Sequence, residues 1–200
     1  NQKIMACTAL TAGRGLDCSR ISGGVKYVYF GVYDQFETAG VQTLPTVVAG
    51  EVTDIEMGTN VLYRYSVPRG STTANETITG STENGTLFYT PTVSMVLNKL
   101  TKEDQNQIKL LGQTQVIVFC QLNAQLANGH DVITAMGVVN AMSLNAGTAD
   151  TGAAFGDRNG YTLTFDGLEA DPFPMVEDYT TVPFDNAAFT MGTICTSNPC

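Results

Sequence analysis

Residues 115–136, QVIVFCQLNAQLANGHDVITAM, decide the fold. Gln115 to Leu122 is apolar at successive positions and rich in β-branched and aromatic side chains, which is typical of a strand buried on both faces. Asp131 to Met136 is a second strand-like run. Asn128-Gly129 between them tolerates the positive φ values of a tight turn. The stretch therefore predicts a β-hairpin in the middle of the chain.

Strand-like sequence continues on both sides of this hairpin. Val25 to Tyr33 is a β-branched and aromatic run, a strong strand signal. Thr86 to Leu97 alternates apolar and polar residues, and Pro91 predicts a bulge or a sheet edge there. Asn84-Gly85 and Asn159-Gly160 repeat the turn signal. Further strands are expected at Glu51 to Met57, Asn60 to Arg69 and Tyr161 to Asp166. Thr72 to Thr79 has almost no core-sized side chains and is expected to be a polar strand or an extended arm.

One helix is predicted over about 101–111. Thr101 precedes Glu103 and Asp104, which resembles a capping box and places acids at the positive end of the helix dipole. Ile108 and Leu111 form a narrow apolar stripe, so we expect the helix to pack against one edge of a sheet.

These elements predict a mainly β fold, an antiparallel β-sandwich or barrel with one short flanking helix. Residues 25–170 form the expected core domain. Residues 1–24 are predicted to be an extended N-terminal arm, and residues 171–200 a weakly structured C-terminal extension because Pro172, Pro174 and Pro183 interrupt regular elements. The alternative for both ends is simple disorder.

The surface is expected to be polar but weakly charged. Charged residues make up only 14% of the chain, against about 25% in an average globular domain. The net charge is −9, and beyond Lys109 nine acids face a single cation, Arg158. Specific binding to a nucleic-acid backbone needs clustered Lys and Arg, so this composition excludes it. A weakly charged surface is cheap to desolvate against copies of itself.

The sequence contains no convincing catalytic or metal-binding pattern. His130, the only histidine, follows a turn, and the nucleophile elbow of serine hydrolases is missing. The absence of Trp disfavours a sugar-cleaving cleft. Five cysteines without a C-x-x-C pair exclude common zinc sites. Cys7 with Cys18, or Cys195 with Cys200, could pair, but the odd count favours a reducing compartment. We expect neither an enzyme nor a cofactor.

No run of about 18 apolar residues occurs that could cross a membrane, and the first residues lack the apolar core of a signal peptide. Both observations favour a protein that does not insert into membranes.

Several stretches resemble virion structural proteins of tailed bacteriophages. They are Met5 to Leu10 with Gly13-Arg14-Gly15, Glu76 to Thr86, Leu100 to Asn106, Asn145 to Gly156 and Gly160 to Glu169. Within that group the chain is most similar to tail tube proteins. The resemblance implies a structural subunit that forms stacked, hexameric rings around an acidic channel through which DNA slides without specific binding.

The resemblance also implies partners and a location. The partners are further copies of the chain and other tail proteins, and the location is the phage tail after assembly in the bacterial cytoplasm. Candidate lumen-facing acids are Asp131, Asp150, Asp157, Asp166 and Glu169. Residues 34–50, with Gly40 and Pro45, are predicted to form a long loop. This loop and the polar segment 72–85 are expected to make ring-to-ring contacts, and the candidate contact residues are Phe36, Glu37, Leu44, Asn75, Glu76 and Thr77.

Two other functions fit the same sequence. One is a different virion component, such as a capsid decoration, neck or tail-terminator protein, which would form a closed assembly. The other is a carbohydrate- or receptor-binding β module, for which Tyr63 and Tyr65 are the candidate contacts.

Overall fold

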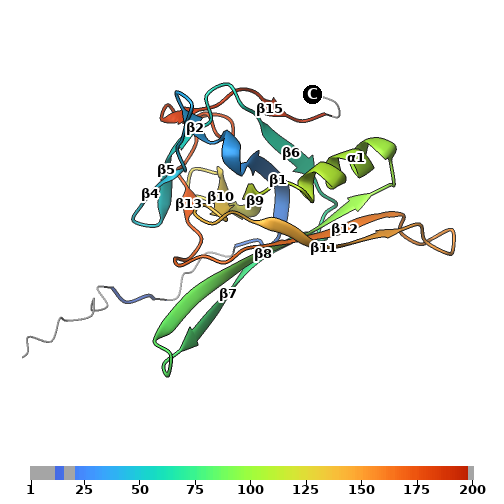
Figure 1. The fold of residues 1–200 in the computed structure, drawn as a ribbon, viewed down its shortest axis with the longest axis horizontal. Coiled ribbons are helices and arrows are strands. Elements are labelled where there is room, and N and C mark those ends of the chain that lie inside the picture. The colour runs from blue at the N-terminus through green and yellow to red at the C-terminus, as the bar shows by residue number, and fades with distance from the viewer. Residues whose placement is uncertain (1–11, 16–20, 198–200) are drawn as a thin grey trace, which may run out of the picture.

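The structure is a computed structural model, and it describes residues 12–15 and 21–197. Most of the predicted arm over residues 1–24, with Cys7 and Cys18, and the last three residues with Cys200 lie outside this part. The fold of the described residues is mainly β with a single α-helix, as predicted (Figure 1).

Three strands form the centre of the molecule: β1 (Val25–Val32), β9 (Val116–Gln125) and β10 (Asp131–Met136). β9 pairs antiparallel with β1 on one side and with β10 on the other. The predicted hairpin of β9 and β10 is therefore confirmed. Side chains of β1 and β9 are buried on both faces, because layers of the protein cover each side.

These three strands belong to a strongly curled nine-stranded sheet. β5 (Glu51–Glu56) lies toward one end of it and β6 (Leu62–Ser66) toward the other. The order is β14-β5-β13-β10-β9-β1-β6-β15, with β4 (Thr46–Val48) added on β5. The described strands do not pair into a closed barrel.

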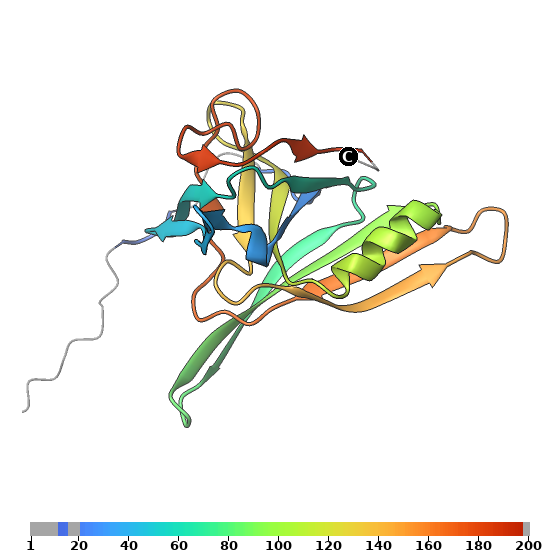
Figure 2. The ribbon, with the colours of Figure 1, turned by 45° about the horizontal axis from the view of Figure 1, so that its top comes forward.

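A second, four-stranded sheet packs across the first in the order β11-β12-β8-β7. All its neighbours are antiparallel. The strands are β7 (Thr73–Ser81), β8 (Thr86–Asn98), β11 (Ser143–Asp150) and β12 (Gly160–Asp166). Figure 2 shows this sheet running beneath the curled sheet and extending past it at both ends.

Two apolar clusters hold the layers together. The first lies between the sheets and contains residues such as Phe30, Met95 and Phe165. The second fills the curl of the nine-stranded sheet and contains Phe119 and Ile55. Alternate residues of β9 supply both clusters, so this strand connects the two halves of the core.

The helix α1 (Lys102–Leu111) covers part of the four-stranded sheet. Thr101 is its N-cap, and its hydroxyl accepts the N–H of Asp104 at 3.1 Å. Ile108 and Leu111 pack on the cluster between the sheets. The predicted cap and apolar stripe are thus both confirmed.

The C-terminal segment differs from the extension predicted for residues 171–200. It is irregular, but its described part packs on the core through β13 (Met175–Val176), β14 (Phe189–Thr190) and β15 (Ile194–Cys195). β14 pairs with β5 and β15 pairs with β6, so the segment bridges the two ends of the curled sheet. Phe184 is buried in the second cluster, and this apolar burial explains why the segment does not stand apart.

One of the two described cysteines differs from the expectation of a reduced chain. Cys120 is a free, buried thiol, and burial raises its pKa to about 12. Cys195 is disulfide-bonded, and its partner lies outside the described residues.

Residues 34–50 are more ordered than a long loop. They begin within the 3-10 turn η1 (Tyr33–Gln35) and then form β2 (Glu37–Thr38), β3 (Val41–Gln42) and β4. Ala39-Gly40 and Ala49-Gly50 each join two strands with positive φ at both residues, the conformation of a type I′ turn.

Two sequence signals have a different role from the predicted one. Asn159-Gly160 is not the tight turn of a hairpin, because Gly160 begins β12 and lies against the Leu97 carbonyl where a Cβ has no room. Pro91 sits in a central strand without a bulge. Its carbonyl accepts the Gly167 N–H, so this edge of Pro91 faces away from β7. The β8–β12 ladder begins at the next residue, Thr92, and the missing N–H of Pro91 therefore interrupts neither ladder.

The positive φ of the alanines in these two turns, Ala39 and Ala49, predicts a stabilising substitution. Ala49 has φ 55°, a conformation that Asn adopts more readily than Ala. We expect Ala49→Asn to raise the free energy of unfolding by about 0.5–1 kcal/mol, measured by thermal denaturation. Ala127→Asn is the control, because Ala127 is equally exposed but is not among the positive-φ residues. An unchanged melting temperature for Ala49→Asn contradicts the strain.

Candidate assembly surfaces

The outer face of the four-stranded sheet is open and almost uncharged. One face of β8 and one face of β12 pack on the core, so the alternate residues of these two strands point away from it. Register pairs such as Thr92 with Asp166 and Ser94 with Thr164 stand side by side on this face. Among the paired residues of β8 and β12, Asp166 is the one carboxylate on this face. The face consists mainly of Thr, Ser and Asn, which form a polar surface with little charge.

Both edges of this sheet are unpaired among the described residues, and backbone contacts fix their orientation. Tyr89 exchanges hydrogen bonds with Glu169 at 2.8 Å in both directions, so its N–H and C=O point away from β7. Its β7 partner, Ile78, must then direct its own N–H and C=O to the free edge. Continuing this alternation across β8 and β12 places the Ala149 N–H at the free edge of β11.

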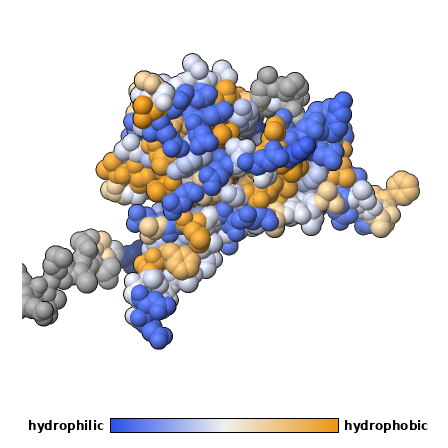
Figure 3. Space-filling view, viewed as in Figure 1, coloured by the Kyte–Doolittle hydropathy of each residue, from blue (hydrophilic) through white to orange (hydrophobic). Residues whose placement is uncertain are grey.

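The hairpin of β7 and β8 projects beyond the body of the protein (Figure 1). Leu87 shares the inward face of β8 with Val93 and Met95, but it is 57% exposed because the curled sheet does not reach it. Ile78 on β7 is 64% exposed. Figure 3 shows a hydrophilic tip on this hairpin with hydrophobic residues behind it. Sequence alternation identified the face of Leu87 but could not reveal that nothing covers it.

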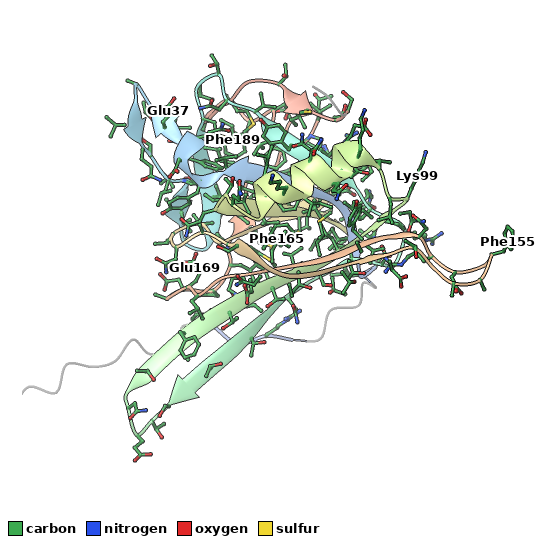
Figure 4. All side chains as sticks on the ribbon, turned by 45° about the vertical axis from the view of Figure 1, so that its right-hand side comes forward. Glu37, Lys99, Phe155, Phe165, Glu169 and Phe189 are labelled. Carbon is green, nitrogen blue, oxygen red and sulfur yellow. The ribbon has the colours of Figure 1, made fainter. Side chains whose placement is uncertain are left out.

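Three of the five predicted lumen acids lie on or beside the open sheet. Asp166 is on the open face, where its carboxylate accepts a hydrogen bond from the Asn145 amide. Asp150 ends β11. Asp157 lies in the loop of residues 151–159, where the N–H groups of Ala154 and Ala153 hold its pKa below the ordinary value. Figure 4 shows Phe155 at the far tip of this loop.

The other two predicted lumen acids are structural. Asp131 is 9% exposed and forms an ion pair with Lys26, with an Nζ to Oδ2 distance of 2.5 Å. Burial opposes ionisation of Asp131, but hydrogen bonds from Lys26, Gln121 and Gln125 outweigh it and lower the pKa. Glu169 is 8% exposed and accepts two backbone N–H groups, and burial raises its pKa. Neither carboxylate can face a channel, since each is used inside the subunit.

The predicted contact residues also separate into two groups. Asn75 and Thr77 are exposed on the open face of β7, and Glu37 is half-buried. Phe36 is fully buried beside Phe119 and cannot contact a neighbour. Leu44 packs on the second cluster. Glu76 turns inward, where its carboxylate accepts the Phe173 N–H at 2.9 Å.

A groove of about 750 Å³ lies between β6 and α1, at the end of the four-stranded sheet opposite the projecting hairpin. Leu110 of α1 is 56% exposed on one side of it. β6 forms the other side, but the guanidinium of Arg64 points away from the groove and lies over the Tyr27 ring, 4.7 Å from its centroid, on the opposite face of the strand. No sequence pattern predicted this groove, because α1 and β6 meet only in the folded chain.

Tyr63 and Tyr65 line the same groove but are half-buried against the core. The ring of Tyr65 meets Phe30 edge to face, with 5.1 Å between the ring centroids, and burial raises the pKa of Tyr65 to about 12. These tyrosines therefore do not form the exposed aromatic platform that a carbohydrate-binding module requires.

Within residues 12–15 and 21–197, no group of three or more potential metal-ligating side chains comes together. The same residues include no helix with the length and apolar character needed to cross a membrane. Comparison with protein families, curated proteins and solved structures finds no match to this chain.

The Lys26 and Asp131 pair predicts a pH-dependent contribution to stability. The pKa of Asp131 is lower in the folded chain, so its stabilisation is complete above the ordinary value near 4 and is lost as pH falls through the folded value. We expect Asp131→Asn to lower the free energy of unfolding by about 1–2 kcal/mol at neutral pH and by progressively less in acid. Urea denaturation from about pH 2 to about pH 7 measures this difference.

Asp171→Asn is the matched control for this measurement. Asp171 is an exposed carboxylate, and surface substitutions of this kind stay within about 0.5 kcal/mol. An equal loss for Asp131→Asn at every pH contradicts the ion pair as the cause.

Proposed function

We propose that this protein is the tube subunit of a tailed-bacteriophage tail, a structural protein that acts by forming rings that stack into a hollow tube. The observation that carries the proposal is the four-stranded sheet with two free edges and one open polar face. The sequence resemblance to tail tube proteins points the same way.

The strand directions support edge-to-edge joining of identical subunits. Four antiparallel strands alternate in direction, so β7 at one edge runs opposite to β11 at the other. An antiparallel ladder therefore continues unbroken when β7 of one copy meets β11 of the next. Free strand edges pair readily in this way, and a repeated head-to-tail contact closes into a ring when its rotation permits.

The open face supports the passage of DNA. Edge-to-edge rings of such sheets have one face toward the channel, and the curled sheet and its apolar cores occupy the other face. A channel wall of Thr, Ser and Asn with scattered acids provides no clustered cations to retain phosphates. In this proposal Asp166 faces the channel, and Asp150 and Asp157 lie near its rim.

Electron microscopy of the purified protein over a range of concentrations tests the proposal. We expect hollow tubes with a regular ring repeat. Isolated closed rings support a terminator or decoration protein instead, and a protein that stays monomeric contradicts assembly through the sheet edges.

A proline at the free edge tests the proposed junction. Ala149→Pro removes an N–H that points away from the β11–β12 ladder, so we expect native stability and a loss of tubes. Ala149→Ser, which retains the donor, is the control and should form tubes at native concentrations. Normal tubes from Ala149→Pro rule out pairing through this edge.

A further inference from the structure

We infer that β7 of one copy pairs with β11 of the next copy in a single register, with Ile78 opposite Gly147 and Gly80 opposite Leu144. The inference rests on the proposed function and specifies the junction between neighbouring copies within a ring. Three features of the two edges select this register: the sizes of the residues along them, the positions where they end, and the strand tilt that results.

Backbone direction limits the registers that are available. Ile78 and Gly80 of β7 both direct their N–H and C=O groups to the free edge, because every second residue of a strand has the same orientation. Leu144, Gly147 and Ala149 do the same on β11, since the residues next to them bond to β12. A shift of one residue would set bonding groups opposite non-bonding ones, so the register can change only in steps of two.

The inward face of each edge carries one large apolar residue and one glycine. Ile78 is 64% exposed and stands two positions from Gly80. Leu144 also stands two ladder positions from Gly147, because a bulge between Leu144 and Ala146 takes up the extra residue. Only one antiparallel register therefore sets both large residues opposite the two glycines, which is the alternation of large and small residues that packs well.

The two glycines leave room for this contact. A Cβ on Gly80 would lie 3.3 Å from Leu87 Cδ1, and a Cβ on Gly147 would lie 3.1 Å from Leu163 Cδ2. Each of these leucines thus leans over a glycine at its own sheet edge. In the inferred register the large residue of the neighbouring copy meets each leucine across the glycine. This contact covers Leu87, which is 57% exposed in the single chain.

The ends of the two edges coincide in the same register. The free edge of β11 stops at Ser143, because Met142 already exchanges backbone hydrogen bonds with Val116, at 3.0 and 2.8 Å. β7 ends at Ser81, and the inferred register sets Ser81 opposite Ser143. A register shifted by two residues toward Val116 would drive the end of β7 into β9. A shift in the other direction would leave Ser143 and Leu144 unpaired.

The polar residues of the open face are matched as well. The register sets Thr77 opposite Thr148 and Asn75 opposite Asp150. Threonine pairs across antiparallel strands are favourable, and the Asn75 amide is a donor for the Asp150 carboxylate. No two charged residues oppose each other across the paired segments, since Glu76 faces Ala149.

The junction also displaces each copy along the strands. Ile78 is level with Tyr89 of β8, whereas Gly147 is level with Met95, six positions further along β8. This offset is about 20 Å along the strands, against about 19 Å across four strands. The strands then tilt by about 45° from the ring axis, close to the range of about 35–45° in closed barrels.

An engineered disulfide tests the register. In the inferred register Thr77 and Thr148 form a non-hydrogen-bonded pair, with Cα atoms about 4.5 Å apart, a spacing that a disulfide can span. Both side chains are exposed, so Thr77→Cys with Thr148→Cys should melt like the native protein. Within one chain the two residues lie on opposite edges of the sheet and cannot bridge. We expect mild oxidation of tubes to give a ladder of covalent oligomers on a non-reducing gel.

Two pairs in neighbouring registers are the matched controls. Asn75→Cys and Thr79→Cys, each combined with Thr148→Cys, keep the same exposed face but move one cysteine two residues along β7. Such diagonal pairs lie about 7–8 Å apart, beyond the reach of a disulfide, so we expect cross-linking at least about tenfold slower. The native chain under the same oxidant gives the background from its own cysteines. Faster cross-linking of either control overturns the register and leaves edge pairing in place.

Mixing the single variants Thr77→Cys and Thr148→Cys confirms that the bond joins two copies, because only covalent dimers can form. Asn75→Cys with Asp150→Cys reports the same register at a second position, and it serves if the first double variant does not assemble. Tubes that form without either cross-link overturn the inference, while the tail-tube function stands. A native protein that never forms tubes overturns the function, and the inference with it.

Discussion

The burial of strand β9 on both faces is the constraint on which the structure depends. Val116, Val118 and Cys120 fill the cluster between the sheets, and Ile117 and Phe119 fill the curl of the larger sheet. A strand with two apolar faces needs a layer on each side. The four-stranded sheet supplies one layer. The far side of the curl, with β5 and the C-terminal segment, supplies the other.

This constraint leaves the four-stranded sheet half used. One of its faces covers the core. The other face and both edges have no partner among the described residues, and both ends extend past the curled sheet. The larger sheet differs in this respect, because the C-terminal segment pairs with β5 at one end of it and with β6 at the other. The protein therefore protects one set of edges and leaves the other available. That asymmetry is the physical basis for proposing assembly through the smaller sheet.

The acidic composition has two separable roles. Inside the subunit, Asp131 forms an ion pair with Lys26, and Glu169 accepts hydrogen bonds from two backbone N–H groups. Asp150, Asp157 and Asp166 remain at the open sheet or its rim. The sequence alone does not distinguish these five acids, because it does not show which carboxylates accept hydrogen bonds inside the folded chain.

The sequence by itself determined the β class, the strands with strong alternation, the central hairpin and the capped helix. These features depend on local periodicity and turn chemistry. It missed β11, whose small residues from Ser143 to Asp150 carry no apolar alternation. It also placed Phe36 at the surface, because a loop-like sequence does not reveal a core pocket beside Phe119. The tertiary structure alone decided which edges stay open, where Leu87 loses its cover and how β6 and α1 form a groove. Each of these depends on how far one sheet extends past another, a distance set by packing between segments remote in the chain.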